Sequence, residues 1–142
     1  MVLISVKAVD VKEYSDHGAG EWFGSELFNW LNDQFYDEAF SEQEKKRIVG
    51  LTNTLDNKEI HYRVNLVASK TLELEKAVNT KVMKCFPSEY VKTRYGKSGP
   101  VDWWIKNYPY ADGKKWTVSN GSYVGSSVDQ PKGGRPMIAI RR

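Results

Sequence analysis

The chain has 142 residues, of which 40% are hydrophobic and 13% aromatic. This composition excludes a disordered chain and provides for one sizeable core. No apolar run approaches the roughly 18 residues of a membrane-spanning helix, and the first residues lack the charged and long apolar regions of a signal peptide. With Cys85 as the single cysteine, we expect a protein of the reducing cytoplasm, or of the cell surface if the chain is a fragment of a longer protein.

The formal net charge of +3 is unevenly distributed along the chain. Residues 106–142 carry seven basic and two acidic side chains, so their net charge is +5 and that of residues 1–105 is −2. A basic C-terminal third favours an anionic partner. A solubilising, frayed Arg-Arg terminus would explain the same charge without a partner.

The N-terminal part is predicted to contain a strand and two helices. The apolar run over residues 2–6 is typical of a buried strand. Ser25 suits a helix N-cap, and apolar residues recur after it with helical spacing. This predicts an amphipathic helix over residues 26–37, with Trp30 beside its aromatic face. A capping-box pattern at Ser41–Glu44 begins a second helix.

The middle of the chain alternates between polar and apolar stretches. Tyr62, Val64 and Leu66 alternate with polar residues, which indicates a half-buried strand. We expect the second helix to end near Gly50, a loop over residues 51–59, a strand over residues 60–68, a helix over residues 69–79 and a helical turn from Pro87 to Gly96.

Two adjacent tryptophans, Trp103 and Trp104, occupy a short apolar run. Neighbouring side chains of a strand point to opposite faces, so one indole should enter a core and the other should meet a second layer or the surface. We expect both to be structural and to anchor the loops that follow them. The helix over residues 26–37 and a final strand over residues 137–140 should hold them in place.

The segment after the tryptophan pair is rich in turn residues. Asn120-Gly121 lies between two β-rich runs, a strong signal for a hairpin because its turn requires positive φ angles. A polar loop should then span residues 125–134. Arg135 precedes Pro136, which favours an extended backbone. We expect its guanidinium to be structural, either hydrogen-bonded to loop carbonyls or stacked on a tryptophan.

Five spaced patterns together resemble a large, functionally uncharacterised bacterial domain family. They are Leu3-Ile4-Ser5, the helix Ser25–Asn32 with Phe35-Tyr36, Ala39-Phe40-Ser41, Asp102–Ile105 and Gly134-Arg135-Pro136. The family is marked by S-x-L-R-x-W-L-N-x-x-F, A-F-S-x-x-E, W-W-L-R-S and G-V-R-P-A, and the match spans nearly the whole chain. The resemblance implies a single C-type-lectin-like domain over residues 1–142. Such an α+β fold would pack short helices on a small mixed or antiparallel sheet, with a loop-rich C-terminal third that faces the ligand.

The chain departs from the family pattern at several positions. Phe28 stands in place of an arginine, and Lys106-Asn107 in place of Arg-Ser. Gly133 replaces an apolar residue, which predicts a looser turn. The N-terminal hairpin of the family is missing, so either the domain is trimmed or a partner covers the strand over residues 2–6, and a homodimer is one way to cover it.

Signals of enzymatic chemistry are weak. His17 and His61 do not stand at metal-ligand spacing with Cys85, and we expect Cys85 to be a buried structural thiol. Gly96-Lys97-Ser98 does not complete a phosphate-binding loop, because Val91 occupies the place of its first glycine. We therefore predict no catalytic residue, no metal site and no cofactor.

A cluster of aromatic and basic side chains between residues 106 and 132 is the predicted ligand-binding surface. Aromatic rings can stack on sugars or bases or anchor a protein partner, and lysines can meet anions. Trp116 and Tyr123 could instead be cross-strand core partners. The predicted ligand-binding residues are Lys106, Tyr108, Tyr110, Lys114, Lys115, Trp116, Tyr123 and Lys132, and the predicted structural residues are Trp30, Trp103, Trp104 and Arg135.

These patterns predict a non-catalytic binding module that presents residues 106–132 to a protein or glycan partner. One alternative is a small phage or mobile-element protein that binds nucleic acid, or a nucleoprotein, through its basic C-terminal third. A second alternative is an enzyme with an unrecognised site. No membrane partner is expected.

Overall fold

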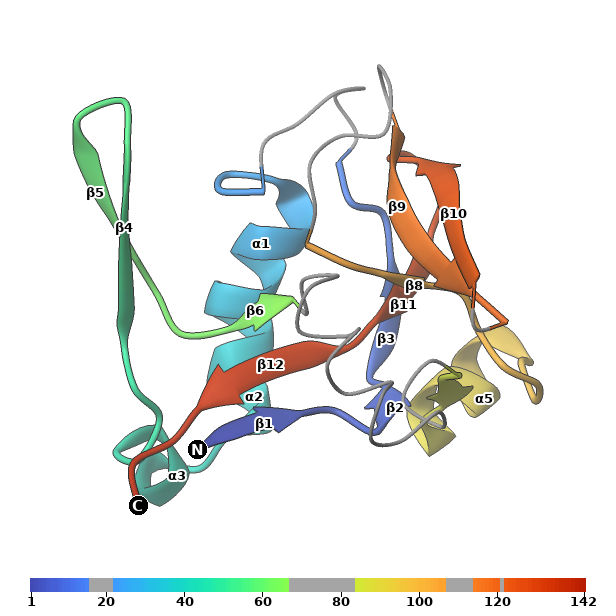
Figure 1. Cartoon of the computed structure of the whole chain (residues 1–142). Coiled ribbons are helices and arrows are strands. Elements are labelled where there is room, and N and C mark those ends of the chain that lie inside the picture. The colour runs from blue at the N-terminus through green and yellow to red at the C-terminus, as the bar shows by residue number, and fades with distance from the viewer. Residues whose placement is uncertain (16–21, 67–83, 107–113, 121) are drawn as a thin grey trace.

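The computed structural model describes residues 1–15, 22–66, 84–106, 114–120 and 122–142. Over these residues the protein is α+β, with a few short helices and several small sheets (Figure 1). The helices are α1 (Glu26–Trp30), the π-helix η1 (Leu31–Phe35), α2 (Tyr36–Ala39), α3 (Glu42–Lys45) and α5 (Glu89–Tyr95). The strands are β1 (Val2–Ile4), β2 (Lys7–Ala8), β3 (Asp10–Lys12), β4 (Leu51–Leu55), β5 (Lys58–Tyr62), β6 (Asn65–Leu66), β7 (Phe86–Pro87), β8 (Trp103–Trp104), β9 (Lys114–Ser119), β10 (Ser122–Ser127), β11 (Lys132–Gly134) and β12 (Pro136–Ala139). No helix of these residues is long and apolar enough to span a bilayer.

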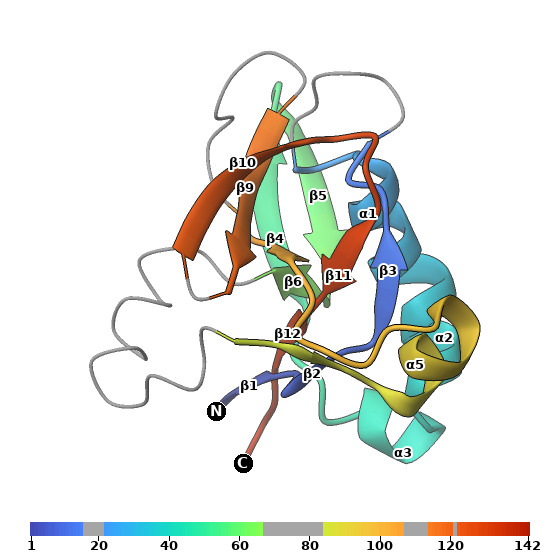
Figure 2. The same cartoon turned by 90° about the vertical axis from the view of Figure 1, so that its right-hand side faces the viewer.

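The largest sheet has the strand order β10-β9-β8-β11-β3, with the tryptophan strand at its centre. β8 pairs antiparallel with β9, where Trp103 lies opposite Val118, and parallel with β11, where it lies opposite Gly133. A second sheet, β1-β12-β6, joins the N-terminal strand to the C-terminal one. The two chain ends therefore lie close together (Figures 1 and 2).

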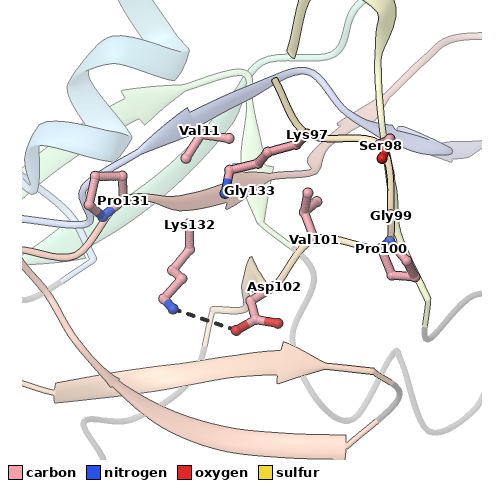
Figure 3. A pocket seen from close by; sticks show the side chains of 10 residues that line it. All are labelled: Val11, Lys97, Ser98, Gly99, Pro100, Val101, Asp102, Pro131, Lys132 and Gly133. Carbon is pink, nitrogen blue, oxygen red and sulfur yellow. Dashed lines mark hydrogen bonds and ion pairs between the residues drawn. The ribbon is translucent and has the colours of Figure 1, made fainter. Parts of the chain in front are cut away.

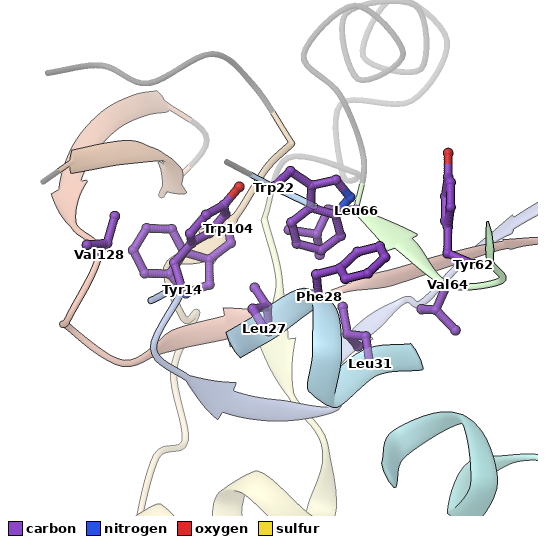
Figure 4. Close-up of a cluster of buried hydrophobic side chains, with 10 residues drawn as sticks. All are labelled: Tyr14, Trp22, Leu27, Phe28, Leu31, Tyr62, Val64, Leu66, Trp104 and Val128. Carbon is purple, nitrogen blue, oxygen red and sulfur yellow. The ribbon is translucent and has the colours of Figure 1, made fainter. Parts of the chain in front are cut away.

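The two tryptophans of β8 enter different cores, as their alternation predicts. Trp104 is fully buried with Tyr14, Leu27 and Leu31 (Figure 4). Its indole N–H donates to the Lys12 carbonyl at 2.8 Å. On the opposite face of β8, Trp103 packs in a second cluster of buried side chains, which also contains Ala8, Cys85, Val101, Ile105 and Val118.

Arg135 makes both kinds of contact expected of it. Its guanidinium carbon lies 4.4 Å from the centre of the Trp103 ring, and its Nε donates to the Ser5 carbonyl at 2.9 Å. Burial lowers the pKa of this guanidinium, which is 4% exposed as a residue. Arg135 thus links β8 to the segment that follows β1.

The first helix is confirmed, with one feature that periodicity did not predict. Ser25 caps it by accepting from the Phe28 N–H at 3.1 Å. Between α1 and α2 the helix widens into a π-turn. There the Asn32 amide donates to the Val64 carbonyl at 2.9 Å, and its oxygen accepts from the Arg63 and Val64 N–H groups at 2.8 Å each. This side chain ties the helix to the strand segment before β6.

Two predictions for residues 45–59 are wrong. The capping box of Ser41 and Glu44 is present, but α3 ends after Lys45, because Ile48 instead forms a bridge with Ile140. Residues 51–59 are not a loop, since β4 and β5 form a hairpin. Asp56 and Asn57 have φ angles of 50° and 61° at its tip, which Asn and Asp tolerate better than most residues.

Predictions for both terminal regions also need correction. β1 is not buried: it pairs with β12, and Val2 and Leu3 remain 57% and 43% exposed. The region over residues 125–134 is not all loop, because β10 extends to Ser127 and β11 forms an inner strand. The predicted helix over residues 69–79 lies outside the described residues.

Gly133 is tightly packed, contrary to the looser turn expected from the family pattern. A Cβ atom at this position would lie 3.0 Å from the Asp102 carbonyl oxygen and 3.1 Å from the Ala8 Cβ. The Gly133 N–H donates to that same carbonyl at 2.7 Å. Glycine therefore permits the close approach of β11 to the chain before β8.

Candidate binding surface

The predicted surface over residues 106–132 divides into several environments. Tyr108, Tyr110 and the side chain of Lys114 lie outside the described residues. Lys106 is half-buried, with its ammonium 5.3 Å from the centre of the Phe23 ring, and burial lowers its pKa. Lys106 is thus partly engaged by an aromatic ring.

Lys115 does not belong to an exposed surface. It is 3% exposed, and its ammonium lies 5.3 Å from the centre of the Tyr14 ring. The register of β9 explains this position. Lys115 and Thr117 share one face of the strand, and Thr117 is paired with Trp104. Lys115 therefore points to the core that contains Trp104.

Trp116 and Tyr123 lie on the other face, with Trp103. Tyr123 is opposite Val118 in the β9–β10 hairpin, and Val118 is opposite Trp103 in β8. Both aromatic residues are half-buried and pack against the Trp103 cluster. This arrangement matches the core-partner alternative, although part of each side chain stays accessible.

Lys132 lines a hollow of about 330 Å³, which we call the lysine hollow (Figure 3). Lys97 enters it from the turn after α5, and Asp102 enters it from the residue before β8. The Lys132 ammonium lies 3.5 Å from the Asp102 carboxylate. Lys97 is exposed and has no ion-pair or hydrogen-bond partner among the described residues. Backbone and side chains of Val11, Ser98, Gly99, Pro100, Val101, Pro131 and Gly133 form the rest of the lining.

A helix cap, a helix end and a backbone hydrogen bond position the residues that line the lysine hollow. Ser88 caps α5, and Gly96 ends it with a left-handed φ of 66°, so the chain turns and Lys97 leaves the helix. Val101 then donates its N–H to the Cys85 carbonyl at 2.8 Å. These contacts hold the Lys97–Pro100 turn next to the edge of the large sheet.

A second hollow of about 440 Å³, the aromatic hollow, adjoins the first and shares Val11 and Pro131 with it. Trp30 and Tyr95 line it together with Lys12, Glu13, Glu26 and Leu27. The Lys12 ammonium lies 4.8 Å from the centre of the Trp30 ring and 3.7 Å from the Asp10 carboxylate. Trp30, predicted to be structural, is half-buried and so also presents a surface.

Tyr95 connects the aromatic hollow to the edge of β3. Its hydroxyl donates to the Asp10 carboxylate at 2.9 Å and lies 3.4 Å from the Val11 carbonyl oxygen. Desolvation raises the pKa of Tyr95, and the hydrogen bond to Asp10 raises it further. The hydroxyl therefore stays protonated near neutral pH and serves as a fixed donor at this edge.

Cys85 and His61 do not line either hollow. Cys85 is 1% exposed, and burial raises its pKa to about 11, so the thiol is neutral near pH 7. His61 is exposed on β5 beside Thr52, with 3.2 Å between the imidazole and the hydroxyl, and His17 is outside the described residues. The described part of the chain contains no group of three or more His, Cys, Asp or Glu side chains that could hold a metal ion.

Sequence reasoning overlooked two residues of the candidate surface, Tyr95 and Lys97. Both flank Gly96, a predicted helix end. In the sequence, Lys97 stands out only as part of an incomplete phosphate-binding loop. Lys97 directly follows the predicted end of a helix and shortly precedes the tryptophan strand. This position predicts an exposed lysine, because segments that connect two elements lie on the surface.

Comparisons with known proteins give a match at the level of the domain family. No curated protein and no solved structure matches the chain. A family model described as "Domain of unknown function (DUF6273)" matches residues 1–142. This extent agrees with the uncharacterised family that the spaced patterns resemble, so the chain belongs to the DUF6273 family.

Proposed function

We propose that the protein is a non-catalytic binding module that recognises a protein or glycan partner. Its surface would combine the loops over residues 106–132 with the two hollows at the edge of the large sheet. The observation that carries the proposal is that Lys132, from the predicted surface, lines a polar hollow directly beside one with aromatic walls.

Several features support this reading of the two hollows. Binding sites commonly combine apolar walls with a few polar groups that set orientation, and partly exposed aromatic residues often anchor protein partners. Trp30 offers such an anchor, and Lys97 and Lys132 offer charged contacts. The elements α1, β3, α5 and β11 each contribute lining residues, and residues 97–102 complete the lysine hollow.

We further propose that the fold is C-type-lectin-like, as the family resemblance implies. Support comes from the pairing of the terminal strands β1 and β12 and from the short helices beside a mixed sheet. The Gly134-Arg135-Pro136 segment also packs against the tryptophan strand through Arg135. An experimental structure would test this assignment by comparison of strand order.

The nucleic-acid alternative has less support from the basic C-terminal third. Lys115 and Arg135 are buried against aromatic rings, and Lys132 is paired with Asp102. Fewer cations are therefore available to phosphates than the sequence suggests. A gel-shift titration with random DNA and RNA tests this alternative, because phosphate contacts produce a steep dependence on salt.

Screening of the immobilised domain against glycan and peptide arrays tests the proposed function. The wild type is compared with a Lys97→Ala, Lys132→Ala double variant and with a control double variant, Lys58→Ala, Lys92→Ala. Lys58 and Lys92 are exposed lysines outside the two hollows. Array ligands should be lost by the first variant and kept by the control. Full retention by the first variant would place the binding surface elsewhere.

A homodimer is also part of this proposal. β1 lies at the edge of its sheet and exposes Val2 and Leu3, and such an edge can pair with a second copy. Sedimentation analysis over a range of concentrations should show a dimer that Leu3→Lys dissociates. A monomer at every concentration would contradict the dimer without affecting the binding surface.

A further inference from the structure

We infer that the two adjoining hollows recognise an acidic peptide segment, in which a carboxylate enters the lysine hollow and an apolar side chain enters the aromatic hollow. The inference rests on the proposed binding function and names the chemical class of its ligand. It follows from the charges of the first hollow, the walls of the second and the residues that they share.

The lysine hollow is suited to a single negative charge. It contains Lys97 and Lys132 against one carboxylate, that of Asp102, so its formal charge is +1. The Lys132–Asp102 pair is long for a charge-assisted hydrogen bond, at 3.5 Å. The Lys97 ammonium has no partner among the described residues, and its side chain extends toward Gly133 (Figure 3). We place the incoming carboxylate beside the unpaired Lys97 ammonium, with Lys132, held by Asp102, as the second cation of the hollow.

The aromatic hollow is suited to an apolar side chain. Trp30, Leu27 and Pro131 supply apolar lining. The Trp30 ring is held in position by Lys12 on one side and by Phe35, whose ring centre is 5.3 Å away. A ring that is fixed before binding loses little conformational freedom when a ligand packs on it.

The acidic residues around the hollows favour a peptide over a polyanion. Glu13 and Glu26 line the aromatic hollow, and Asp102 lines the lysine hollow. A nucleic-acid backbone that crossed both hollows would bring successive phosphates next to these carboxylates, and like charges in contact oppose binding. One carboxylate followed by an apolar side chain avoids that repulsion.

The shared residues set the spacing of the two ligand groups. Val11 and Pro131 line both hollows, so the carboxylate and the apolar group should be near neighbours in the ligand. In an extended peptide, side chains two positions apart point to the same side. A Glu-x-Phe arrangement is therefore the simplest ligand of this class.

Calorimetric titration of the full chain with a capped Glu-x-Phe peptide tests the inference. Gln-x-Phe and Glu-x-Ala peptides, a short single-stranded oligonucleotide and inorganic phosphate serve as comparison ligands. We expect the Glu-x-Phe peptide to bind at low salt. The Gln-x-Phe peptide and the Lys97→Ala variant should each bind about tenfold more weakly, the scale of one charge-assisted contact. The Glu-x-Ala peptide should bind more weakly because it buries less apolar surface in the aromatic hollow. The control variant Lys92→Ala should bind as the wild type does, since Lys92 pairs with Glu89 on α5, outside the hollows.

Other results would overturn the inference in distinguishable ways. Equal binding of the Gln-x-Phe peptide would exclude carboxylate recognition, and equal binding of the Glu-x-Ala peptide would exclude the aromatic hollow. Tighter binding of phosphate or of the oligonucleotide would identify a phosphate site instead. If no peptide binds but Lys97→Ala and Lys132→Ala still abolish binding of an array ligand, the acidic-peptide inference fails and the proposed binding function stands. If array ligands are unaffected as well, both fail.

Discussion

Two groups of aromatic and basic side chains in this protein occupy contrasting environments. Around β8, the rings of Trp103 and Trp104 are fully buried, and the Arg135 guanidinium is buried against one of them. Around the two hollows, Trp30 and Lys97 keep accessible surface. The residue types are alike, so residue type alone does not separate a core from a recognition surface. Their place in the fold separates them: β8 is paired on both sides within the large sheet, whereas Trp30 lies on α1 and Lys97 follows α5. The first group should therefore govern stability, and we expect the second to govern binding.

The largest expected effect comes from Trp104→Ala. Removal of this fully buried ring should lower the free energy of unfolding by about 3–5 kcal/mol, because it leaves a cavity among Tyr14, Leu27 and Leu31. Urea denaturation followed by circular dichroism measures the change. A variant that kept its stability and lost only ligand binding would reverse the roles assigned to the two groups.

A smaller loss is expected from Arg135→Met, which keeps much of the side-chain volume. The variant loses the hydrogen bond to Ser5 and the charge above Trp103, which should cost about 1–3 kcal/mol. Arg142→Met, at the exposed chain end, is the matched control. Equal melting temperatures for the two variants would show that the buried guanidinium contributes nothing to folding.

The Cys85 thiol should make the free energy of unfolding fall as the pH becomes alkaline. Burial raises its pKa from its ordinary value of 9.0 to about 11, so the unfolded chain releases this proton at a lower pH than the folded chain. The stability that the buried, neutral thiol contributes is fully present below the pKa of Cys85 in the unfolded chain. It is lost as the pH rises through the pKa of Cys85 in the folded chain. The wild type should thus lose about 2–3 kcal/mol more than Cys85→Ala between about pH 8 and pH 11. Parallel stability curves for the two proteins would contradict this.

The smallest expected effect on stability is that of Lys97→Ala. Its side chain is exposed and unpaired among the described residues, so the free energy of unfolding should change by less than about 0.5 kcal/mol. Thermal denaturation beside the binding titration measures both properties on one sample. A large loss of stability would mean that the lysine hollow is part of the structural framework.

Local chemistry made several elements predictable from the sequence. Ser25, the Ser41–Glu44 box, Gly96 and Asn120 each satisfy a cap or turn through contacts within a few residues. The alternation of Trp103 and Trp104 follows from strand geometry in the same way. Periodicity and turn chemistry are short-range properties, so these predictions did not depend on the rest of the fold.

Long-range pairing accounts for most of what the sequence did not predict. β11 lies between β3 and β8 although more than 100 residues separate it from β3, and no local signal in Lys132–Gly134 indicates a strand. The same pairing brings Lys132 to a hollow, whereas Lys115, an apparently similar lysine, is directed to the core. Tyr95 and Trp30 meet at one hollow only because α1 and α5 both lie beside β3.

The close packing of Gly133 couples these two regions mechanically. The residue lies within β11, one position after Lys132 and two before Arg135, and a methyl group there would press against Asp102 and Ala8. Any shift of β11 that relieved this pressure would move the lysine of the hollow and the guanidinium above Trp103 together. The absence of a side chain at Gly133 therefore fixes how the lysine hollow is aligned with the core around Trp103.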